Sequence, residues 1–302
     1  MALILDGREP AKRIREWVAA SVADLRAKHG WTPGMVTVQI GDNPAAERYV
    51  RSQLRACENA GISARVERFP AGITKKKFLR ELTNIDRDPN VDGIILQTPF
   101  PEGWAADEIL SAIPSSKDVE GVHPENLGRL YLGEKNIPFP CTAWAAVSLL
   151  EWYGRSSFEW NNCAIVGRSA NVGRAAALLL MHRQATITVC HTRTSSEQLR
   201  KTMSSADVVI VATGVAGVLQ PDMLPRSAWV VDIGTNITDD GRLIGDVAPE
   251  AESVVEAISP VPGGVGPITV SLLLANLLLC ATKRRLGESL VLNVKKLKES
   301  VK

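Results

Sequence analysis

The sequence predicts an α/β protein of two domains, each built around a parallel sheet. Its 302 residues are more than a single hydrophobic core usually serves. Short apolar runs alternate with amphipathic segments in two blocks, which is the pattern of βαβ units. An irregular segment rich in Gly, Pro and Asn, residues 115–140, separates the blocks, and we predict a site loop followed by a linker there.

The first block opens with a helix whose apolar positions are spaced by four, four and three residues. They are Ile14, Val18, Val22 and Leu25, and Gly30 is the predicted C-cap. Residues 35–40 form an apolar run that predicts a buried strand. Asn43 and Pro44 then suit the N-cap and first position of a helix that ends near Ala60.

The remaining elements alternate in the same way. The first block continues with strands over 64–68 and 91–97 and with a helix whose apolar face is Phe78, Leu79, Leu82 and Ile85. A helix over 142–150 leads into the second block. There we predict strands over 163–166, 185–189, 208–212 and 229–233, and helices over 171–184, 196–203 and 270–284.

Charge and cysteine content argue against several classes of function. The 35 Lys and Arg residues nearly balance the 33 Asp and Glu residues, so no general attraction for nucleic acid or membranes is expected. The longest apolar stretch, 270–281, is shorter than the roughly 18 residues of a membrane span, and the N-terminus does not look like a signal peptide. Five scattered cysteines without a CxxC pair predict neither a metal site nor disulfides, and a cytoplasmic location is the default.

The segment 167–173, with the sequence GRSANVG, lies between a predicted strand and a predicted helix. Open α/β sheets bind a dinucleotide pyrophosphate at this position, on the helix N-terminus. Ser169 replaces the second glycine of a GxGxxG loop, and the last glycine, Gly173, comes one residue late. Taken alone, the segment fits either a cofactor loop or an ordinary tight turn.

The end of the next predicted strand favours a phosphorylated cofactor. NAD enzymes usually have an acid there that binds the ribose hydroxyls, whereas this chain has His191, Thr192 and Arg193. Arg168 and Arg193 could pair with a 2′-phosphate, and Thr192 could donate its hydroxyl. We therefore predict NADP, with two solvated arginines that bind nothing as the alternative.

Eight segments spread over nearly the whole chain carry further information. They are YV at 49–50, DGIILQTPFP at 92–101, KDVEGVHPENLGRL at 117–130, PCT at 140–142, GRSANVG at 167–173, VVDIGTN at 230–236, GDV at 245–247 and PVPGGVGPIT at 260–269. In order and spacing they resemble the bifunctional methylenetetrahydrofolate dehydrogenase/cyclohydrolase family. The last segment alone is highly specific.

The resemblance implies a folate-binding catalytic domain of residues 1–140 plus 271–302 and a Rossmann-type NADP-binding domain of residues 141–270. It also implies a cleft between these domains, tetrahydrofolate C1 derivatives as substrates, and a homodimer. The dehydrogenase of this family passes hydride from 5,10-methylenetetrahydrofolate to the nicotinamide. In bifunctional members, water then opens the methenyl product to 10-formyltetrahydrofolate.

Carried onto this chain, the resemblance assigns three sets of site residues. The catalytic set is Tyr49, Gln53, Gln97 and Glu120. The substrate-binding set is Tyr49, Gln97, Thr98, Glu120, Pro262, Gly263 and Gly264. The cofactor-binding set is Gly167, Arg168, Ser169, Val172, Gly173, His191, Thr192, Arg193, Thr213, Gly214, Gly234, Asn236 and Thr269. No metal is expected. A carboxylate at Glu120 can accept two hydrogen bonds from the aminopyrimidine edge of a pterin.

This sequence departs from the family pattern mainly in the folate pocket. Gln53 stands where the family has its acid/base lysine, and Glu120 replaces an aspartate; Ala46, Thr98 and Ala143 replace serine, leucine and proline. A neutral amide cannot exchange a proton near pH 7, whereas hydride transfer depends mainly on alignment of two rings. We therefore predict an NADP-dependent dehydrogenase whose cyclohydrolase activity is weak or absent.

Three alternatives remain open at this point. The first is a fully bifunctional enzyme in which another group or a water replaces the lysine. The second is a non-catalytic folate- or nucleotide-binding homologue, to which the changes at Gln53 and Glu120 point. The third is an NADP reductase acting on a modified C1 carrier, with Glu120 and Thr98 as the adapting residues.

Overall fold

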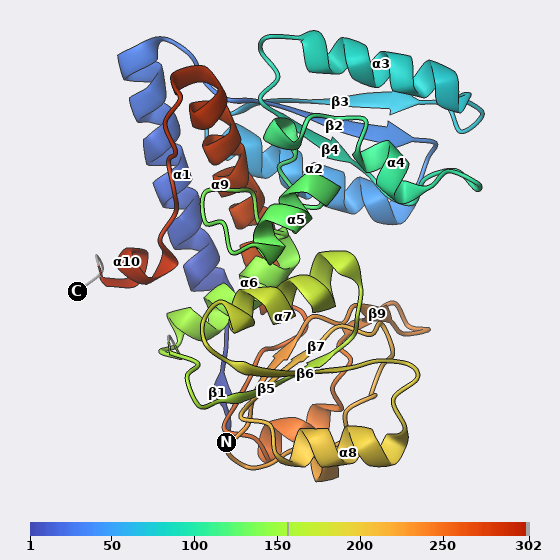
Figure 1. The fold of residues 1–302 in the computed structure, drawn as a ribbon, viewed down its shortest axis with the longest axis vertical. Helices are drawn as coiled ribbons and strands as arrows, with labels where there is room; N and C mark the ends of the chain where they lie inside the picture. Colours follow the sequence, from blue (N-terminus) through green and yellow to red (C-terminus); the bar gives the residue numbers. More distant parts are fainter. Residues whose placement is uncertain (156, 300–302) are drawn as a thin grey trace. The chain divides into compact units, whose positions relative to one another are not determined.

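The structure, a computed structural model, describes residues 1–155 and 157–299, apart from the side chains at 44–46, 48, 295 and 299. Ala46 is among these, so its predicted place in the folate pocket lies outside the described side chains. By its contacts the chain divides into two compact units (Figure 1). The six-stranded unit comprises Met1–Lys12, Pro140–Thr269 and Asn293–Lys302, and the three-stranded unit comprises Arg13–Phe139 and Val270–Leu292.

These units differ from the predicted domains at both ends of the chain. The first residues belong to the six-stranded unit because β1 (Leu3–Ile4) pairs in parallel with β11 (Ala257–Ile258). The last residues belong to it as well, since α10 (Val294–Glu299) packs on α6 (Cys141–Trp152). The predicted domains, which follow the family resemblance, place both ends with the N-terminal domain instead. The two-residue strand β1 has no periodicity that could reveal its pairing.

The three-stranded unit contains the parallel sheet β3-β2-β4, as predicted from the first block. Its strands are β2 (Gly34–Ile40), β3 (Ser63–Phe69) and β4 (Gly93–Leu96), and its connecting helices are α2 (Pro44–Asn59) and α3 (Lys75–Arg87). Helix α3 buries Phe78, Leu82 and Ile85 against the sheet, which confirms the predicted helix face. The long helix α1 (Arg8–His29) begins in the six-stranded unit and continues into this one.

The segment 115–140, predicted to be irregular, contains a helix. After α4 (Ala106–Leu110) and a short 3₁₀ turn η1 (Ser115–Lys117), the chain forms α5 (Pro124–Tyr131). His123 caps this helix because its Nδ1 accepts the backbone N–H of Glu125 at 3.0 Å, and Pro124 takes the first helical position. The Gly, Pro and Asn content of this segment indicated a loop. It did not reveal a helix whose first residue is a proline.

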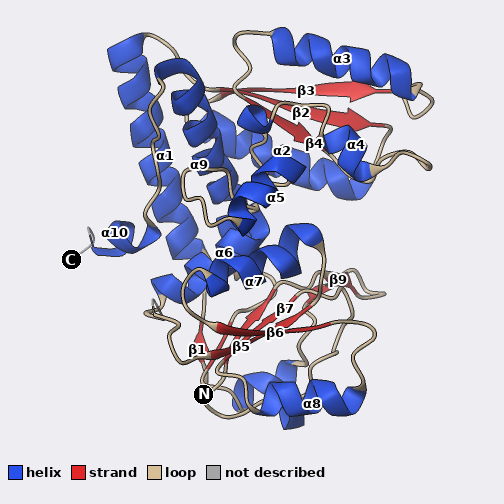
Figure 2. Cartoon of the chain, in the orientation of Figure 1, coloured by secondary structure: helices blue, strands red, loops and turns tan. Residues whose placement is uncertain are grey.

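The six-stranded unit contains an entirely parallel sheet in the order β1-β11-β8-β7-β5-β6. Four of its strands lie in the predicted second block. They are β5 (Asn162–Val166), β6 (Thr186–Cys190), β7 (Val208–Val211) and β8 (Trp229–Asp232). Helices α6 and α7 (Ala175–Met181) lie on one face of the sheet and α8 (Ser196–Ser204) on the other (Figure 2). The Rossmann-type prediction is therefore confirmed.

Some elements of this unit escaped the sequence. The predicted helix 171–184 begins instead as a π-type turn, η2 (Ala170–Arg174), before α7. A hairpin of β9 (Asn236–Ile237) and β10 (Leu243–Ile244) and two short 3₁₀ turns, η3 (Pro221–Met223) and η4 (Pro249–Ser253), carry too few residues to produce a periodic signal.

Helix α9 (Val265–Leu286) is longer than the predicted helix 270–284. By length and composition alone it could cross a membrane, the only such helix within the described residues. Most of its apolar stretch is buried inside the structure, and it contains the buried polar residues Ser271 and Asn276. Both features are those of a core helix.

Candidate functional site

The predicted cofactor residues gather at one edge of the six-stranded sheet. Val166, the last residue of β5, is in register with Cys190 of β6 on one side and with Val211 of β7 on the other, and Val211 is in register with Asp232 of β8. The loops that follow these strands therefore lie side by side. The chain leaves β5 toward β6 and returns to β7 on the other side, so this edge contains the switch point at which open α/β sheets bind ligands.

The glycines of the 167–173 loop are required by close backbone approach. Gly167 has a φ of +133°, and a Cβ there would lie 2.4 Å from the carbonyl oxygen of Ala212. A Cβ at Gly173 would lie 2.1 Å from the carbonyl oxygen of Gly167. Ser169 caps the turn, since its Oγ accepts the N–H of Gly173 at 3.4 Å, and Val172 is half-buried. A loop whose glycines keep Cβ atoms out of these two close approaches, ahead of a helix, fits a pyrophosphate.

The end of β6 carries cations and no acid. His191 accepts the N–H of Arg193 through Nδ1 at 3.1 Å, which folds the residues after β6 into a turn. Thr192, Arg193 and Arg168 are exposed. Within residues 1–155 and 157–299, neither guanidinium group is in an ion pair. This edge can therefore accept a phosphate without first breaking a salt bridge.

Two buried aspartates, which the sequence reasoning did not select, organise the ends of β7 and β8. Asp246 accepts hydrogen bonds from three predicted cofactor residues, Thr213, Gly214 and Asn236. Asp232 accepts the backbone N–H groups of Gly234 at 2.8 Å and of Asp246 at 3.0 Å. Both aspartates stand within the VVDIGTN and GDV segments, so the motifs contained a signal, although nothing in their spacing showed that they meet.

The Asp232 carboxyl is held in a dry environment. It is 4% exposed, and burial raises its pKa, although the donated backbone N–H groups act in the opposite direction. A Cβ at Gly245 would lie 2.0 Å from Asp232 Oδ2, and a Cβ at Gly234 would lie 2.2 Å from Asp246 Oδ1. The two glycines are therefore required by the two carboxylates.

The glycine-rich segment at 260–269 also belongs to the six-stranded unit. Gly263 has a φ of +114°, and its carbonyl oxygen accepts the N–H of Gly7 at 2.8 Å. A Cβ on Gly7 would lie only 1.8 Å from the carbonyl oxygen of Gly264. Pro262 follows a cis peptide bond, and Thr269 is buried with its hydroxyl bonded to the Val265 carbonyl at 3.2 Å.

The predicted folate residues meet at the corresponding edge of the three-stranded sheet. Gln97 follows β4, and its Nε2 donates to Oε1 of Gln53 on α2 at 3.4 Å. Gln53 is fully buried, and its own Nε2 has no partner among the described residues. Tyr49 lies one helical turn earlier and is 36% exposed, and Thr98 is exposed. An orphaned buried amide N–H₂ is a donor that a ligand could satisfy.

Glu120 is held at the same sheet edge by its neighbours in the chain. A parallel bridge pairs Ile94 with Asp118, so residues 118–120 run alongside β4. Asn276 of α9 donates to the Val119 carbonyl at 2.8 Å. Asp118 accepts the N–H of Gly121 at 3.0 Å and also receives bonds from the next turn. Burial, with a smaller contribution from the Asp118 charge, raises the pKa of Glu120 to about 8.

Comparison with known proteins decides the family. Residues 5–120 match the tetrahydrofolate dehydrogenase/cyclohydrolase catalytic domain, and residues 140–285 match the tetrahydrofolate dehydrogenase/cyclohydrolase NAD(P)-binding domain. The chain belongs to this family.

Relatives match over nearly the full length. The bifunctional protein FolD of Chloroflexus aurantiacus is 41% identical over 288 residues, which cover 95% of this chain and 99% of the relative. The FolD methylenetetrahydrofolate dehydrogenase/cyclohydrolase of Campylobacter jejuni has a crystal structure with a TM-score of 0.90, 37% identity and coverage of 94% and 100%. The Trypanosoma brucei FolD enzyme, solved with NADP and an inhibitor, has a TM-score of 0.89, 32% identity and coverage of 95% and 99%.

Four predictions made from the sequence are thereby confirmed: the family, the two-domain α/β fold, an enzyme with dehydrogenase activity, and NADP as the cofactor. The individual site residues stay predictions. Of the predicted substrate-binding set, Tyr49, Gln97, Thr98 and Glu120 lie in the three-stranded unit, whereas residues 262–264 lie in the six-stranded unit. Among the described residues, no group of three His, Cys, Asp or Glu side chains could hold a metal ion.

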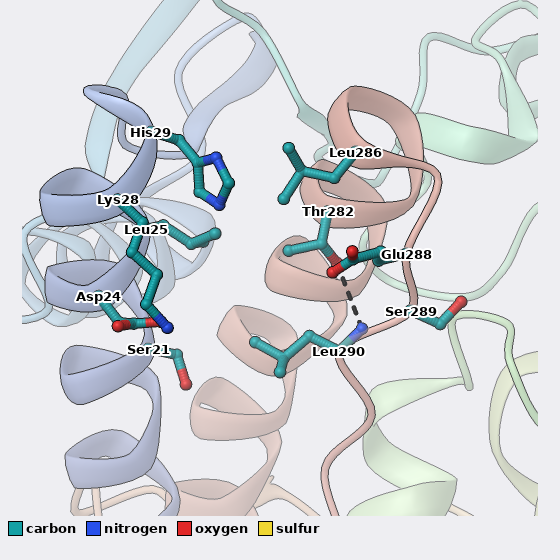
Figure 3. A pocket seen from close by; sticks show the side chains of 10 residues that line it. All are labelled: Ser21, Asp24, Leu25, Lys28, His29, Thr282, Leu286, Glu288, Ser289 and Leu290. Atoms are coloured by element: carbon teal, nitrogen blue, oxygen red, sulfur yellow. Dashed lines mark hydrogen bonds and ion pairs between the residues drawn. The ribbon is translucent and has the colours of Figure 1, made fainter.

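One pocket of this family member lies away from all the predicted site residues. It opens in the three-stranded unit between α1 and the end of α9 (Figure 3). Part of its polar lining is paired: Lys28 and Asp24 form an ion pair at 3.0 Å, and Leu290 N donates to Thr282 Oγ1 at 3.3 Å. None of the residues that line it belongs to the predicted site. The pocket therefore contributes nothing to the candidate site.

Proposed function

We propose that this enzyme oxidises 5,10-methylenetetrahydrofolate to 5,10-methenyltetrahydrofolate with NADP, and that its cyclohydrolase activity is weak or absent. The observation that carries the proposal is Gln53. It is fully buried and hydrogen-bonded to Gln97 at the position where the family resemblance puts a lysine. A neutral amide there can orient a ligand but cannot exchange a proton.

The proposed NADP site lies along the carboxyl ends of β5 to β8. The 167–173 cradle would hold the pyrophosphate, and Arg168 and Arg193, both exposed and unpaired among the described residues, would bind the 2′-phosphate. The predicted cofactor-binding residues at the ends of β7 and β8 would hold the remainder of the dinucleotide. When bound, NADP supplies the hydride acceptor.

The residues of the three-stranded unit would bind and orient the folate. Tyr49 offers a ring for stacking, Gln97 and Gln53 offer amide groups, and Glu120 would bind the aminopyrimidine edge. Two N–H donors on that edge require an ionised carboxylate. Because the pKa of Glu120 is raised to about 8, folate binding near pH 7 would be accompanied by loss of a proton from Glu120.

The two reactions depend differently on these groups. Transfer of hydride needs the two rings aligned and no proton acceptor, because the folate nitrogen lone pair expels the hydride. Attack of water on the methenyl carbon releases a proton, and ring opening places one on the departing nitrogen. A positioned acid/base group contributes about 10²–10⁴-fold to such steps. Gln53 cannot exchange a proton, so the rate of hydrolysis is lowered and that of hydride transfer is not.

A fully bifunctional enzyme is the second candidate, and one observation favours it. Glu120, with a pKa of about 8, can exchange a proton near neutral pH and could partly replace the lysine. The relatives named above are described as bifunctional. The two candidates differ in whether the methenyl product leaves or is hydrolysed.

The deciding experiment supplies methenyltetrahydrofolate and follows its absorbance, corrected for spontaneous hydrolysis. The dehydrogenase rate is measured on the same sample from NADPH formation. We expect NADPH formation without matching decay of the methenyl compound. Enzyme-accelerated decay at a rate comparable to the dehydrogenase would establish the bifunctional alternative.

The remaining expectations complete the proposal. We propose that residues 1–140 plus 271–302 bind folate and residues 141–270 bind NADP, with the two chain ends joined structurally to the six-stranded unit. We also propose a homodimer in the cytoplasm, and no role in binding nucleic acid or membranes. Size-exclusion chromatography with light scattering tests the oligomeric state.

A further inference from the structure

One buried carboxylate connects the ends of β7 and β8. Oδ2 of Asp246 accepts the Thr213 hydroxyl at 2.8 Å, the backbone N–H of Gly214 at 3.0 Å and the backbone N–H of Thr213. Oδ1 of the same carboxylate accepts Nδ2 of Asn236 at 2.9 Å. Four donors from three predicted cofactor residues on two strand ends thus converge on one side chain.

Buried neighbouring groups fix the position of the Asp246 carboxylate. Asp246 is fully buried, and its backbone N–H donates to Oδ1 of Asp232 at 3.0 Å. The carboxylate also packs closely on Gly234, where a Cβ would lie 2.2 Å from Asp246 Oδ1. The carboxylate is therefore preorganised, and the groups bonded to it are held with it.

The carboxylate also sets the orientation of the Asn236 amide. Nδ2 of Asn236 donates both to Asp246 Oδ1 and to the Gly245 carbonyl at 3.1 Å, so the nitrogen end of the amide faces the protein. The amide oxygen is left as an acceptor, and a bound N–H group can use it. Asp246 and the Gly245 carbonyl together decide which end of Asn236 a ligand meets.

The sheet order indicates which half of the dinucleotide these residues meet. A pyrophosphate on the 167–173 loop lies at the end of β5, and a 2′-phosphate on Arg193 lies beyond β6. In the order β8-β7-β5-β6, the strands β7 and β8 are on the opposite side of β5 from β6. The nicotinamide half is the end of the dinucleotide that is distant from the 2′-phosphate. It therefore lies at the ends of β7 and β8.

We infer that Asp246 is the positioning residue for the nicotinamide half of NADP, acting through Thr213, Gly214 and Asn236 without touching a reacting atom. This inference rests on the proposed NADP site. It differs from a purely structural role in one respect: loss of the carboxylate should weaken binding of the whole dinucleotide but leave binding of its adenosine half unchanged.

The test uses Asp246→Asn, which keeps the size of the side chain. Either orientation of the new amide turns an N–H₂ group toward donors, either the Thr213 and Gly214 N–H groups or Asn236 Nδ2. Affinities are measured by calorimetry for NADP and for 2′,5′-ADP, which carries only the adenosine half and its 2′-phosphate. We expect NADP to bind about 10-fold more weakly or worse and 2′,5′-ADP to bind as in the unmodified enzyme.

Asp207→Asn is the matched control. Its carboxylate also accepts a backbone N–H, that of Asn162 at 2.8 Å, but at the opposite edge of the same sheet. We expect this variant to bind both ligands normally. If Asp246→Asn weakens both ligands equally, or neither, the inference is overturned, because Asp246 is then structural only.

Thr213→Val provides a second variant in case Asp246→Asn does not fold. It removes one of the donors to Asp246 at nearly constant volume, and we expect NADP binding to weaken by about 3-fold with 2′,5′-ADP binding unchanged. Unchanged NADP binding in this variant would count against the inference. Failure of the unmodified enzyme to bind 2′,5′-ADP would instead overturn the proposed NADP site itself.

Discussion

The two candidate ligand edges of this enzyme differ in how their buried polar groups are paired. At the carboxyl edge of the six-stranded sheet, Asp232 and Asp246 are saturated with hydrogen bonds from backbone and side-chain donors. At the edge of the three-stranded sheet, the Gln53 amide nitrogen has no partner among the described residues, and burial leaves Glu120 with a raised pKa. The buried carboxylates of the first edge are hydrogen-bonded without a ligand, whereas the buried Gln53 amide of the second edge keeps an unused donor.

Most of the described departures from the family resemblance fall on the second edge, whereas Ala143 lies on α6 of the six-stranded unit. Gln53, Thr98 and Glu120 are all on the folate side, while the glycines at 167 and 234 are each enforced by an atom less than 2.5 Å from a hypothetical Cβ. Substitution of a saturated, close-packed group is costly, because the change creates a clash or an unpaired group. A site in which some polar groups lack hydrogen-bond partners can accept substitutions, and these substitutions change its chemistry. The following experiments test this contrast.

The largest effect is expected for Glu120→Ala. Removing both hydrogen-bond acceptors for the aminopyrimidine edge should weaken folate binding about 100-fold or more, with NADP binding unchanged, as measured by titration calorimetry. Glu125→Ala, which removes an exposed carboxylate five residues away, is the control and should change neither affinity. Activity that depends on a divalent ion held by Glu120 would contradict the assigned role.

Gln53→Lys should increase enzyme-dependent hydrolysis of methenyltetrahydrofolate by about 10- to 100-fold, because an acid/base group returns to the pocket. Decay of the methenyl absorbance measures it. Ser52→Lys places the same charge on the exposed side of α2 and should have no effect. If Gln53→Lys leaves hydrolysis unchanged, the substitutions at Glu120 or Thr98 have also reshaped the pocket.

The affinity for folate should depend on pH through Glu120. Below a pKa of about 8 the acid is mostly protonated and cannot accept both N–H bonds, so the KM for methylenetetrahydrofolate should fall about 20-fold as the pH rises from 6.5 to 8.5. The KM for NADP, measured over the same range, serves as the reference. A folate KM that is flat with pH would show that Glu120 is ionised throughout.

Arg168→Ala should weaken NADP binding about 10-fold and leave the weaker binding of NAD little changed, because only NADP carries a 2′-phosphate. Initial rates with each cofactor give the comparison. Arg226→Ala, an exposed arginine just before β8 at the opposite edge of the sheet, should alter neither. Equal use of NAD and NADP by the unmodified enzyme would refute the assignment of the two arginines.

The smallest effect concerns stability. The folded enzyme holds a proton on Glu120 that the unfolded chain releases near its ordinary pKa, so this residue makes stability fall as the pH rises from about 4.5 to about 8. Glu120→Gln removes the ionisation and should raise Tm by a few degrees at pH 9, with little change at pH 5. Thermal unfolding at both pH values tests the sign: a lower Tm at pH 9 would contradict it.

Much of the architecture could be predicted from the sequence because it depends on local patterns. Apolar spacing located α3, and alternating strands and helices predicted both parallel sheets. The spacing of the eight motifs identified the family. Elements without a repeat were missed: β1 is two residues long, and α5 is hidden in a segment whose composition suggests a loop.

The candidate site was predicted by residue type but not by contact. Gln53 and Gln97 are 44 positions apart, and only the fold of the three-stranded unit brings their amides within 3.4 Å. Thr213 and Asp246 are likewise 33 positions apart, so no local pattern could show that one carboxylate holds the cofactor residues of β7 and β8.

The sequence by itself therefore determined the family and the two-sheet α/β architecture, because both are written in residue identity and spacing, and it has Gln53 at the position where the family resemblance puts a lysine. Only the tertiary structure decided which polar groups are satisfied and which are left over. Asp246 is saturated, Gln53 keeps an unpaired donor, and Glu120 is raised to a pKa of about 8. The reason is physical: hydrogen-bond satisfaction and desolvation depend on the distant segments that surround a group, and those are known only once the chain is folded.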